Sequence, residues 1–158
     1  MKLKFYKIRK NAKLPHRAHP TDAGADLFYC PDLSQKSPCV WNPDHKFKIP
    51  PGENCLVPTG LKVNLPLRYM LEIKNKSSVA TKRQLLVGAC VVDPGYTGEI
   101  LVNLHNLGRE TQEIAPGQKI AQAVLVPIEV CGVTETFVDP ENKKTLRGSG
   151  GFGTTGEY

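Results

Sequence analysis

The sequence predicts an all-β fold, a sandwich or barrel of the jelly-roll kind. Thirteen prolines and fourteen glycines interrupt the 158 residues every few positions, which leaves little room for helices. The runs between them are short, rich in valine, isoleucine and leucine, and bounded by turn residues, as β-strands are. Because these runs also recur at fairly regular spacing, they favour a sandwich or barrel over an α/β fold.

The expected elements follow one another without an internal repeat. In "KLKFYKI" lysines alternate with Leu3 and Phe5, which predicts a half-buried strand. Longer strand-like runs cover residues 54–65, 69–75, 85–92, 98–106 and 119–130. One short helix is expected over "SSVATKRQ", with Ser77 or Ser78 as its N-cap.

Length and composition predict a single domain. A chain of 158 residues is long enough to bury its own core, and its 40% hydrophobic and 23% charged residues are ordinary for a globular protein. We expect a barrel domain over residues 1–146 and a separate glycine-rich segment over residues 147–158. The polar, proline-broken stretch 30–48 is expected to be a loop insertion.

The cellular setting is predicted to be cytoplasmic. No apolar run is long enough to span a bilayer, and the first residues lack a signal-peptide core, so no membrane partner is expected. Five cysteines without a C-x-x-C pair are expected to be free thiols. Cys30, Cys39 and His45 could share a zinc ion, but their spacing matches no common zinc pattern and a fourth ligand is missing.

The stretch "VVDPGYTGEI", residues 91–100, is the first candidate for chemistry. Asp93 follows an apolar strand and precedes a Pro-Gly turn, which exposes its carboxylate, and Tyr96 can line the same pocket. A carboxylate on a rigid turn can accept a proton from water or a sugar hydroxyl. The alternative is that Asp93 only caps the turn.

A phosphate site is predicted in "KNKSSVA", residues 74–80. Lys76, Ser77 and Ser78 offer a cation, hydroxyls and backbone N–H groups at the start of the expected helix. The usual P-loop and dinucleotide-binding patterns are absent, while the net charge of +6 suits a ligand that carries phosphates. The alternative is an ordinary N-cap beside a solvated lysine.

Three further features are weaker. Gln122 lies on a strand and either points into a polar site or sits at a strand edge. Asp22 and Asp26 in "DAGADL" either hold a magnesium ion through its waters or form a turn. The tail "RGSGGFGTTGEY", with Arg147 and Phe152 among glycines and threonines, suits a flap that closes over phosphates and a flat ring.

Taken in order, "AGADL", "KSSVA", "VVDPGYTGEI", "GQKIAQ" and "RGSGGFGTTG" resemble the five motifs of trimeric dUTPases. The resemblance runs from Asp22 to Gly156, and its third and fifth motifs are the most specific. It implies distorted jelly-roll subunits in a homotrimer with shared active sites. It also implies Mg²⁺ as cofactor and hydrolysis of dUTP to dUMP and pyrophosphate, which limits uracil in DNA and supplies dUMP. Specific nucleic-acid binding is not expected.

The resemblance also implies roles for individual residues. Asp93 would bind the 3′-hydroxyl and orient the attacking water, Tyr96 would pack under the sugar and exclude a 2′-hydroxyl, and Asp26 would contact the water shell of Mg²⁺. The tail would act as a lid. Uracil would be read by Val87, Gly88, Ala89 and Phe152, and phosphates would be bound by Lys76, Ser77, Ser78, Gln122, Arg147, Gly153, Thr154 and Thr155.

The chain departs from the family pattern at four places. Lys76 replaces an arginine, Gln118 and Lys119 replace "Asp-Arg", and Cys90 replaces a glycine in the third motif. A lysine is a point charge, whereas arginine can bind phosphate with two parallel hydrogen bonds.

Two other functions stay open on the same fold. A dCTP deaminase, or a bifunctional deaminase and dUTPase, would need a catalytic glutamate where this chain has Asn103. A nucleotide-sensing regulatory protein could dock a partner through the 30–48 insertion, which carries Trp41.

Overall fold

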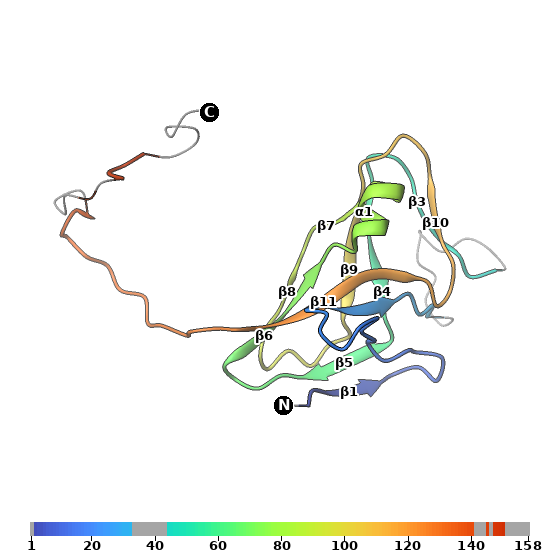
Figure 1. Ribbon diagram of the computed structural model, residues 1–158, viewed down its shortest axis with the longest axis horizontal. Coiled ribbons are helices and arrows are strands. Elements are labelled where there is room, and N and C mark those ends of the chain that lie inside the picture. The colour runs from blue at the N-terminus through green and yellow to red at the C-terminus, as the bar shows by residue number, and fades with distance from the viewer. Residues whose placement is uncertain (1, 33–43, 141–144, 146, 151–158) are drawn as a thin grey trace.

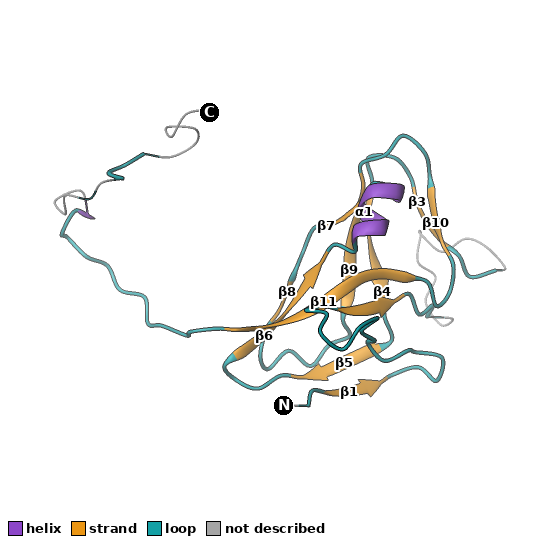
Figure 2. Ribbon diagram, viewed as in Figure 1, coloured by secondary structure: helices purple, strands orange, loops and turns teal. Residues whose placement is uncertain are grey.

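The computed structural model describes residues 2–32, 44–140, 145 and 147–150. Within this part of the chain it contains eleven β-strands and one short α-helix, which confirms the predicted all-β class. Figure 2 shows the strands gathered in one body, from which the segment that begins at residue 128 runs away in extended form.

The strands pair antiparallel in four groups (Figure 1). In their order of hydrogen-bonded neighbours, the groups are β1 (Lys4–Lys7) with β5 (Leu61–Asn64); β10 (Gln112–Ile114) with β3 (Phe47–Ile49); β2 (Ala25–Phe28), β11 (Lys119–Pro127), β6 (Tyr69–Lys74) and β8 (Val91–Val92); and β4 (Asn54–Pro58), β9 (Leu101–Asn106) and β7 (Leu85–Val87).

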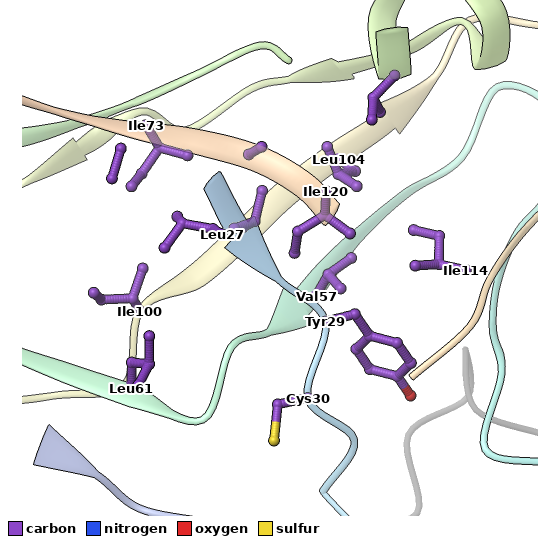
Figure 3. Packing of buried hydrophobic residues seen from close by; sticks show 14 of the residues in the cluster. Leu27, Tyr29, Cys30, Val57, Leu61, Ile73, Ile100, Leu104, Ile114 and Ile120 are labelled. Atoms are coloured by element: carbon purple, nitrogen blue, oxygen red, sulfur yellow. The ribbon is translucent and has the colours of Figure 1, made fainter. Parts of the chain in front are cut away.

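The core lies between these groups and is built from alternate residues of the strands. Figure 3 shows Leu27, Ile73, Leu104 and Ile120, from four different strands, pointing into one apolar interior, and all four are almost completely buried. Burying an aliphatic side chain of this size contributes about 1.5–3 kcal/mol. This interior fixes the strand ends on which the polar motifs lie.

An aromatic pair closes one side of the core. The rings of Tyr29 and Phe47 meet edge to face with centroids 5.6 Å apart, and the Tyr29 hydroxyl donates a hydrogen bond of 2.8 Å to the carbonyl oxygen of His45. Burial raises the pKa of Tyr29 to about 12.

Three details differ from the sequence-based expectations, and the first is that the run 85–92 forms two strands, β7 and β8. The run 54–65 forms two strands, because the backbone turns at Gly60, whose φ of +72° favours glycine. The helix α1 (Ser77–Arg83) has Lys76 as its N-cap residue, without a side-chain capping bond, so the prediction of a serine cap was wrong. Ser77 is instead the first helical residue, and its carbonyl oxygen accepts a hydrogen bond from Thr81.

The cysteines also differ in part. Cys30, Cys90 and Cys131 are free, as predicted, but Cys55 is disulfide-bonded, so the prediction of a free thiol was wrong there. The zinc option included Cys39, which lies outside the described residues. No helix in the described ranges is both long and apolar enough to cross a membrane.

Candidate active site

Asp93 lies on an exposed turn at the end of a buried strand. Val92 of β8 is buried against β6, and the chain then turns at Gly95, which has a φ of +89°. The turn is closed by a hydrogen bond of 3.2 Å from the Tyr96 backbone N–H to the Asp93 carbonyl oxygen. We call residues 93–99 the Asp93 turn; it presents the carboxylate to solvent, as the sequence predicts.

Tyr96 is the half-exposed aromatic residue of this turn. It is 47% exposed, and its hydroxyl donates a hydrogen bond of 3.0 Å to the carbonyl oxygen of Glu99. The ring also lies directly against Gly98: a Cβ on that glycine would clash with the Tyr96 ring and hydroxyl. Tyr96 is therefore held in a defined orientation beside Asp93.

Asp26 is buried in a second polar cluster and is paired with two lysines. Its Oδ1 atom lies 2.9 Å from the Lys76 ammonium and its Oδ2 atom 2.7 Å from the Lys119 ammonium. Burial alone would raise the pKa of Asp26, but hydrogen bonds from Lys119 and Lys76 hold it below its usual value. Two cations around one anion leave a net positive charge beside the exposed Ser77 and Ser78.

Gln122 belongs to the same neighbourhood as this lysine cluster (Asp26, Lys76 and Lys119). On β11 it pairs with Asp26 on one side and with Lys74 on the other. Its amide donates a hydrogen bond of 2.9 Å to the Asn75 carbonyl oxygen, while the Asn75 side chain accepts one of 2.7 Å from the Val87 N–H. Sequence reasoning missed Asn75, because no motif marks a residue that acts through tertiary contacts.

The turn between β7 and β8 rests on two side chains of β9. The N–H groups of Gly88 and Ala89 donate to the backbone and side-chain oxygens of Asn103, at 2.9 and 3.2 Å. A Cβ at Gly88 would clash with both Asn103 and His105, so only glycine allows this close approach. Asn103 is thus a structural support, and its amide cannot take up and release a proton as the carboxyl group of a deaminase glutamate would.

The two polar groups lie far apart within one chain. Val92 pairs with Leu71 of β6, and Asp93 continues from there toward Met70, whereas Lys76 lies six positions beyond Met70 in the other direction. At about 3.3 Å per residue, the part of β6 from Met70 to Lys74 alone puts about 13 Å between the two ends of the strand. No hydrogen bond or ion pair of the described residues joins the Asp93 turn to the lysine cluster.

Comparison with known proteins identifies the family. The family model described as dUTPase matches residues 43–156, which is most of the chain. This chain belongs to the dUTPase family. A deoxyuridine 5′-triphosphate nucleotidohydrolase of Gloeothece citriformis is 42% identical over 99% of this chain and 97% of its own length. A relative of the same description from Clostridium kluyveri is 39% identical, with 99% of each chain covered.

Solved structures show the same fold for this dUTPase. The dUTPase of Staphylococcus bacteriophage 80alpha with dUpNHpp matches with a TM-score of 0.81 at 24% identity, covering 98% of both chains. A mutant dUTPase from phage phi11 of S. aureus, described with a structural Mg(II) ion, matches with a TM-score of 0.74 at 23% identity, covering 89% of this chain and 99% of that one. The predicted dUTPase-like jelly roll is thereby confirmed.

The tail of this dUTPase is described only in part. Arg147 is exposed, and its Nε atom donates a hydrogen bond of 3.1 Å to the nearby Gly150 carbonyl oxygen. Phe152 and the residues 153–155 lie outside the described residues, so the predicted lid stays a prediction.

Proposed function

We propose that this dUTPase hydrolyses dUTP to dUMP and pyrophosphate by in-line attack of a water that Asp93 orients. The observation that carries the proposal is the Asp93 turn, which holds an exposed carboxylate beside a fixed tyrosine in a chain of this family. A carboxylate so placed can act as general base, and phosphoryl transfer otherwise depends on positioning and charge. The reaction would limit uracil in DNA and supply dUMP.

Selectivity for the nucleotide is assigned to the two turns that flank β8. Tyr96 would pack under the deoxyribose and leave no room for a 2′-hydroxyl, which rejects UTP. The backbone of Val87, Gly88 and Ala89 would read uracil. Asn103 of β9 supports this backbone by accepting hydrogen bonds from the Gly88 and Ala89 N–H groups. Because the support is a neighbouring strand, the turn is held in one shape before the nucleotide arrives.

The phosphates are assigned to the lysine cluster together with Ser77, Ser78 and Gln122. The cluster offers two ammonium groups at the start of α1, and Asp26 holds both of them by ion pairs. Such an arrangement neutralises a polyanion without the fork geometry of arginine. Arg147 and residues 152–155 would add their contacts as the lid closes.

Magnesium is proposed to enter with the triphosphate. Among the described residues no three His, Cys, Asp or Glu side chains stand together as a metal cage, which suits an ion coordinated mainly by phosphate oxygens and water. Lys76 and Lys119 engage both oxygens of Asp26, so contact of this carboxylate with that water shell would need one of the lysines to turn toward the phosphates. The ion, when bound, would neutralise charge on the phosphates.

The active site is proposed to be shared among subunits of a homotrimer. Because about 13 Å of β6 lies between the Asp93 turn and the lysine cluster of one chain, a single reacting phosphate would not reach both. The segment after β11 supports the same view, because it leaves the barrel (Figure 1) with Val133 at 96% and Phe137 at 93% exposure. Such apolar side chains are typical of a surface that another subunit covers.

Pyrophosphate release tests the proposed function. The purified protein with Mg²⁺ is offered dUTP, dTTP, UTP and dCTP separately, and turnover of dUTP alone is expected. Equal release from several nucleotides would contradict the assigned base and sugar selectivity. Ammonia release from dCTP would instead support the deaminase.

A further inference from the structure

The Glu99 carboxylate is a largely buried group at the end of the Asp93 turn. Its side chain is 17% exposed, and its Oε1 atom accepts a hydrogen bond of 2.6 Å from the Gly60 backbone N–H. The same oxygen forms an ion pair with the guanidinium of Arg9. A buried charge with two partners of this kind holds a single position, because leaving either partner would cost desolvation energy.

Arg9 is held as tightly on its own side. Its side chain is 15% exposed, and besides Glu99 it contacts the Asp32 carboxylate at 3.4 Å. Arg9 therefore connects the N-terminal segment to the Asp93 turn, ninety positions further along the chain.

Gly60, the backbone partner of Glu99, lies in a closely packed loop. Its φ is +72°, and a Cβ there would lie 2.7 Å from the Ala12 Cβ atom and 2.8 Å from the Cys30 sulfur, so the Cα atom of Gly60 is closely packed against neighbouring side chains. The next residues are fixed as well, since the Ile100 N–H donates to the Leu61 carbonyl oxygen at 2.8 Å. The end of the turn is therefore anchored to the loop between β4 and β5.

We propose that Glu99 is a positioning residue that, with Arg9, sets the orientation of Tyr96 and through it the rejection of the ribonucleotide. The link is direct, because the Tyr96 hydroxyl donates to the backbone carbonyl oxygen of Glu99 itself. This inference rests on the proposed function in that Tyr96 faces the sugar. Glu99 acts through Tyr96, since its own carboxylate is engaged by the Gly60 N–H and the Arg9 guanidinium.

The test compares kcat/KM for dUTP and for UTP in three variants. Glu99→Leu removes both interactions and is expected to lower the ratio of dUTP to UTP activity about tenfold, since a displaced positioning group loses discrimination of this order. Glu99→Gln keeps an oxygen for the Gly60 N–H and is expected to retain the ratio within about threefold. Arg9→Met leaves Glu99 in place without its cation and is expected to fall between them.

Hydrogen exchange of the backbone amides gives a readout that does not depend on activity. In Glu99→Leu and Arg9→Met, peptides that cover residues 93–100 are expected to exchange faster, because the anchor of the turn is lost. Glu113→Gln is the control. Glu113 lies on β10, far from the Asp93 turn in sequence, and the substitution removes its ion pair with the Lys48 ammonium, which is 3.0 Å away. It is expected to leave both the ratio and the exchange unchanged.

The outcomes separate the inference from the function on which it rests. Folded Glu99→Leu and Arg9→Met proteins with wild-type exchange at residues 93–100 would overturn the inference, and so would faster exchange with an unchanged nucleotide ratio. A wild-type protein that does not hydrolyse dUTP would overturn the proposed function, while the exchange result would still decide whether Glu99 positions the turn.

Discussion

Asp93 and Asp26 have the same side chain, but one is exposed and the other is buried, which suits them to different roles. Asp93 is exposed on a turn, as its proposed role of general base for a bound water requires. Asp26 is 5% exposed and neutralised by Lys76 and Lys119, so its first task is to hold two cations in place. A buried carboxylate is tolerated only because both of its oxygens have a partner.

Replacing Asp93 by asparagine should remove turnover and leave binding intact. Asparagine has nearly the same shape but cannot take the proton, and general-base catalysis contributes about 10²–10⁴-fold. We expect kcat for dUTP to fall by about a thousandfold, with the thermal unfolding midpoint unchanged because the side chain is exposed. Steady-state kinetics and calorimetric dUTP binding measure this; a fall in binding that matches the fall in kcat would contradict the assigned role.

The ion pairs of Asp26 predict an acid-sensitive stability. Because the pKa of this carboxyl is below its ordinary value of 3.8 in the folded state, its contribution is present above that value and is lost as pH falls through the folded pKa. The free energy of unfolding of the wild type should therefore drop more between pH 5 and pH 2.5 than that of Asp26→Asn. Denaturant unfolding at both pH values measures the difference, and parallel losses in the two proteins would contradict it.

The turn between β7 and β8 is the element to which we assign base recognition. Its shape comes from contact with β9, where Asn103 and His105 lie directly beneath Gly88. Cys90, the departure from the family's glycine, is half-buried at the start of the return strand, and its carbonyl oxygen accepts a 2.7 Å hydrogen bond from the Ile73 N–H. This contact is made by the backbone and so does not depend on the side chain at position 90.

Gly88→Ala should disturb base selectivity more than stability. The new methyl group would clash with Asn103 and His105, so the exposed turn has to move outward while β7 and β8 keep their partners. We expect kcat/KM for dUTP to fall about tenfold or more, with the preference over dCTP reduced. Kinetics with both nucleotides and a thermal unfolding scan measure this; a large loss of stability with unchanged preference would contradict it.

At the scale of the whole molecule, the barrel separates the two halves of the proposed site instead of joining them. Strand β6 lies between them: Val92 pairs near its beginning, and the lysine cluster lies beyond its end. A trimer with cyclic symmetry would overcome this separation, because it can place the Asp93 turn of each chain beside the lysine cluster of a neighbouring chain. The extended segment after β11 offers apolar side chains for such contacts.

Mixing two inactive variants tests the shared site. One carries Asp93→Asn and the other carries Lys76→Ala with Ser77→Ala; each should be inactive alone. Co-expressed, they form mixed trimers in which some sites take an intact turn from one chain and an intact phosphate cluster from the other, so partial dUTPase activity should return. Light scattering should give three times the 17.4 kDa of one chain. A trimer without recovered activity would contradict sharing.

Much of this protein could be predicted from local patterns. The alternation in β1, the runs of aliphatic residues in β6, β9 and β11, and the exposed Asp93 before Pro-Gly follow from rules that act over a few residues. The short strands β2, β3 and β10 lie outside the predicted runs, since three or four residues carry too little pattern. The disulfide of Cys55 was missed because spacing along the chain does not show which sulfurs meet.

By itself, then, the sequence determined the all-β class, the order of the motifs and the chemical character of each, because strand periodicity, turn residues and motif chemistry are local properties. Only the tertiary structure decided that Asp26 binds Lys76 and Lys119, that Asn103 supports Gly88, and that Glu99 meets Arg9. These contacts join residues that are distant along the chain, and strand pairing with burial in one core is the physical step that brings them together.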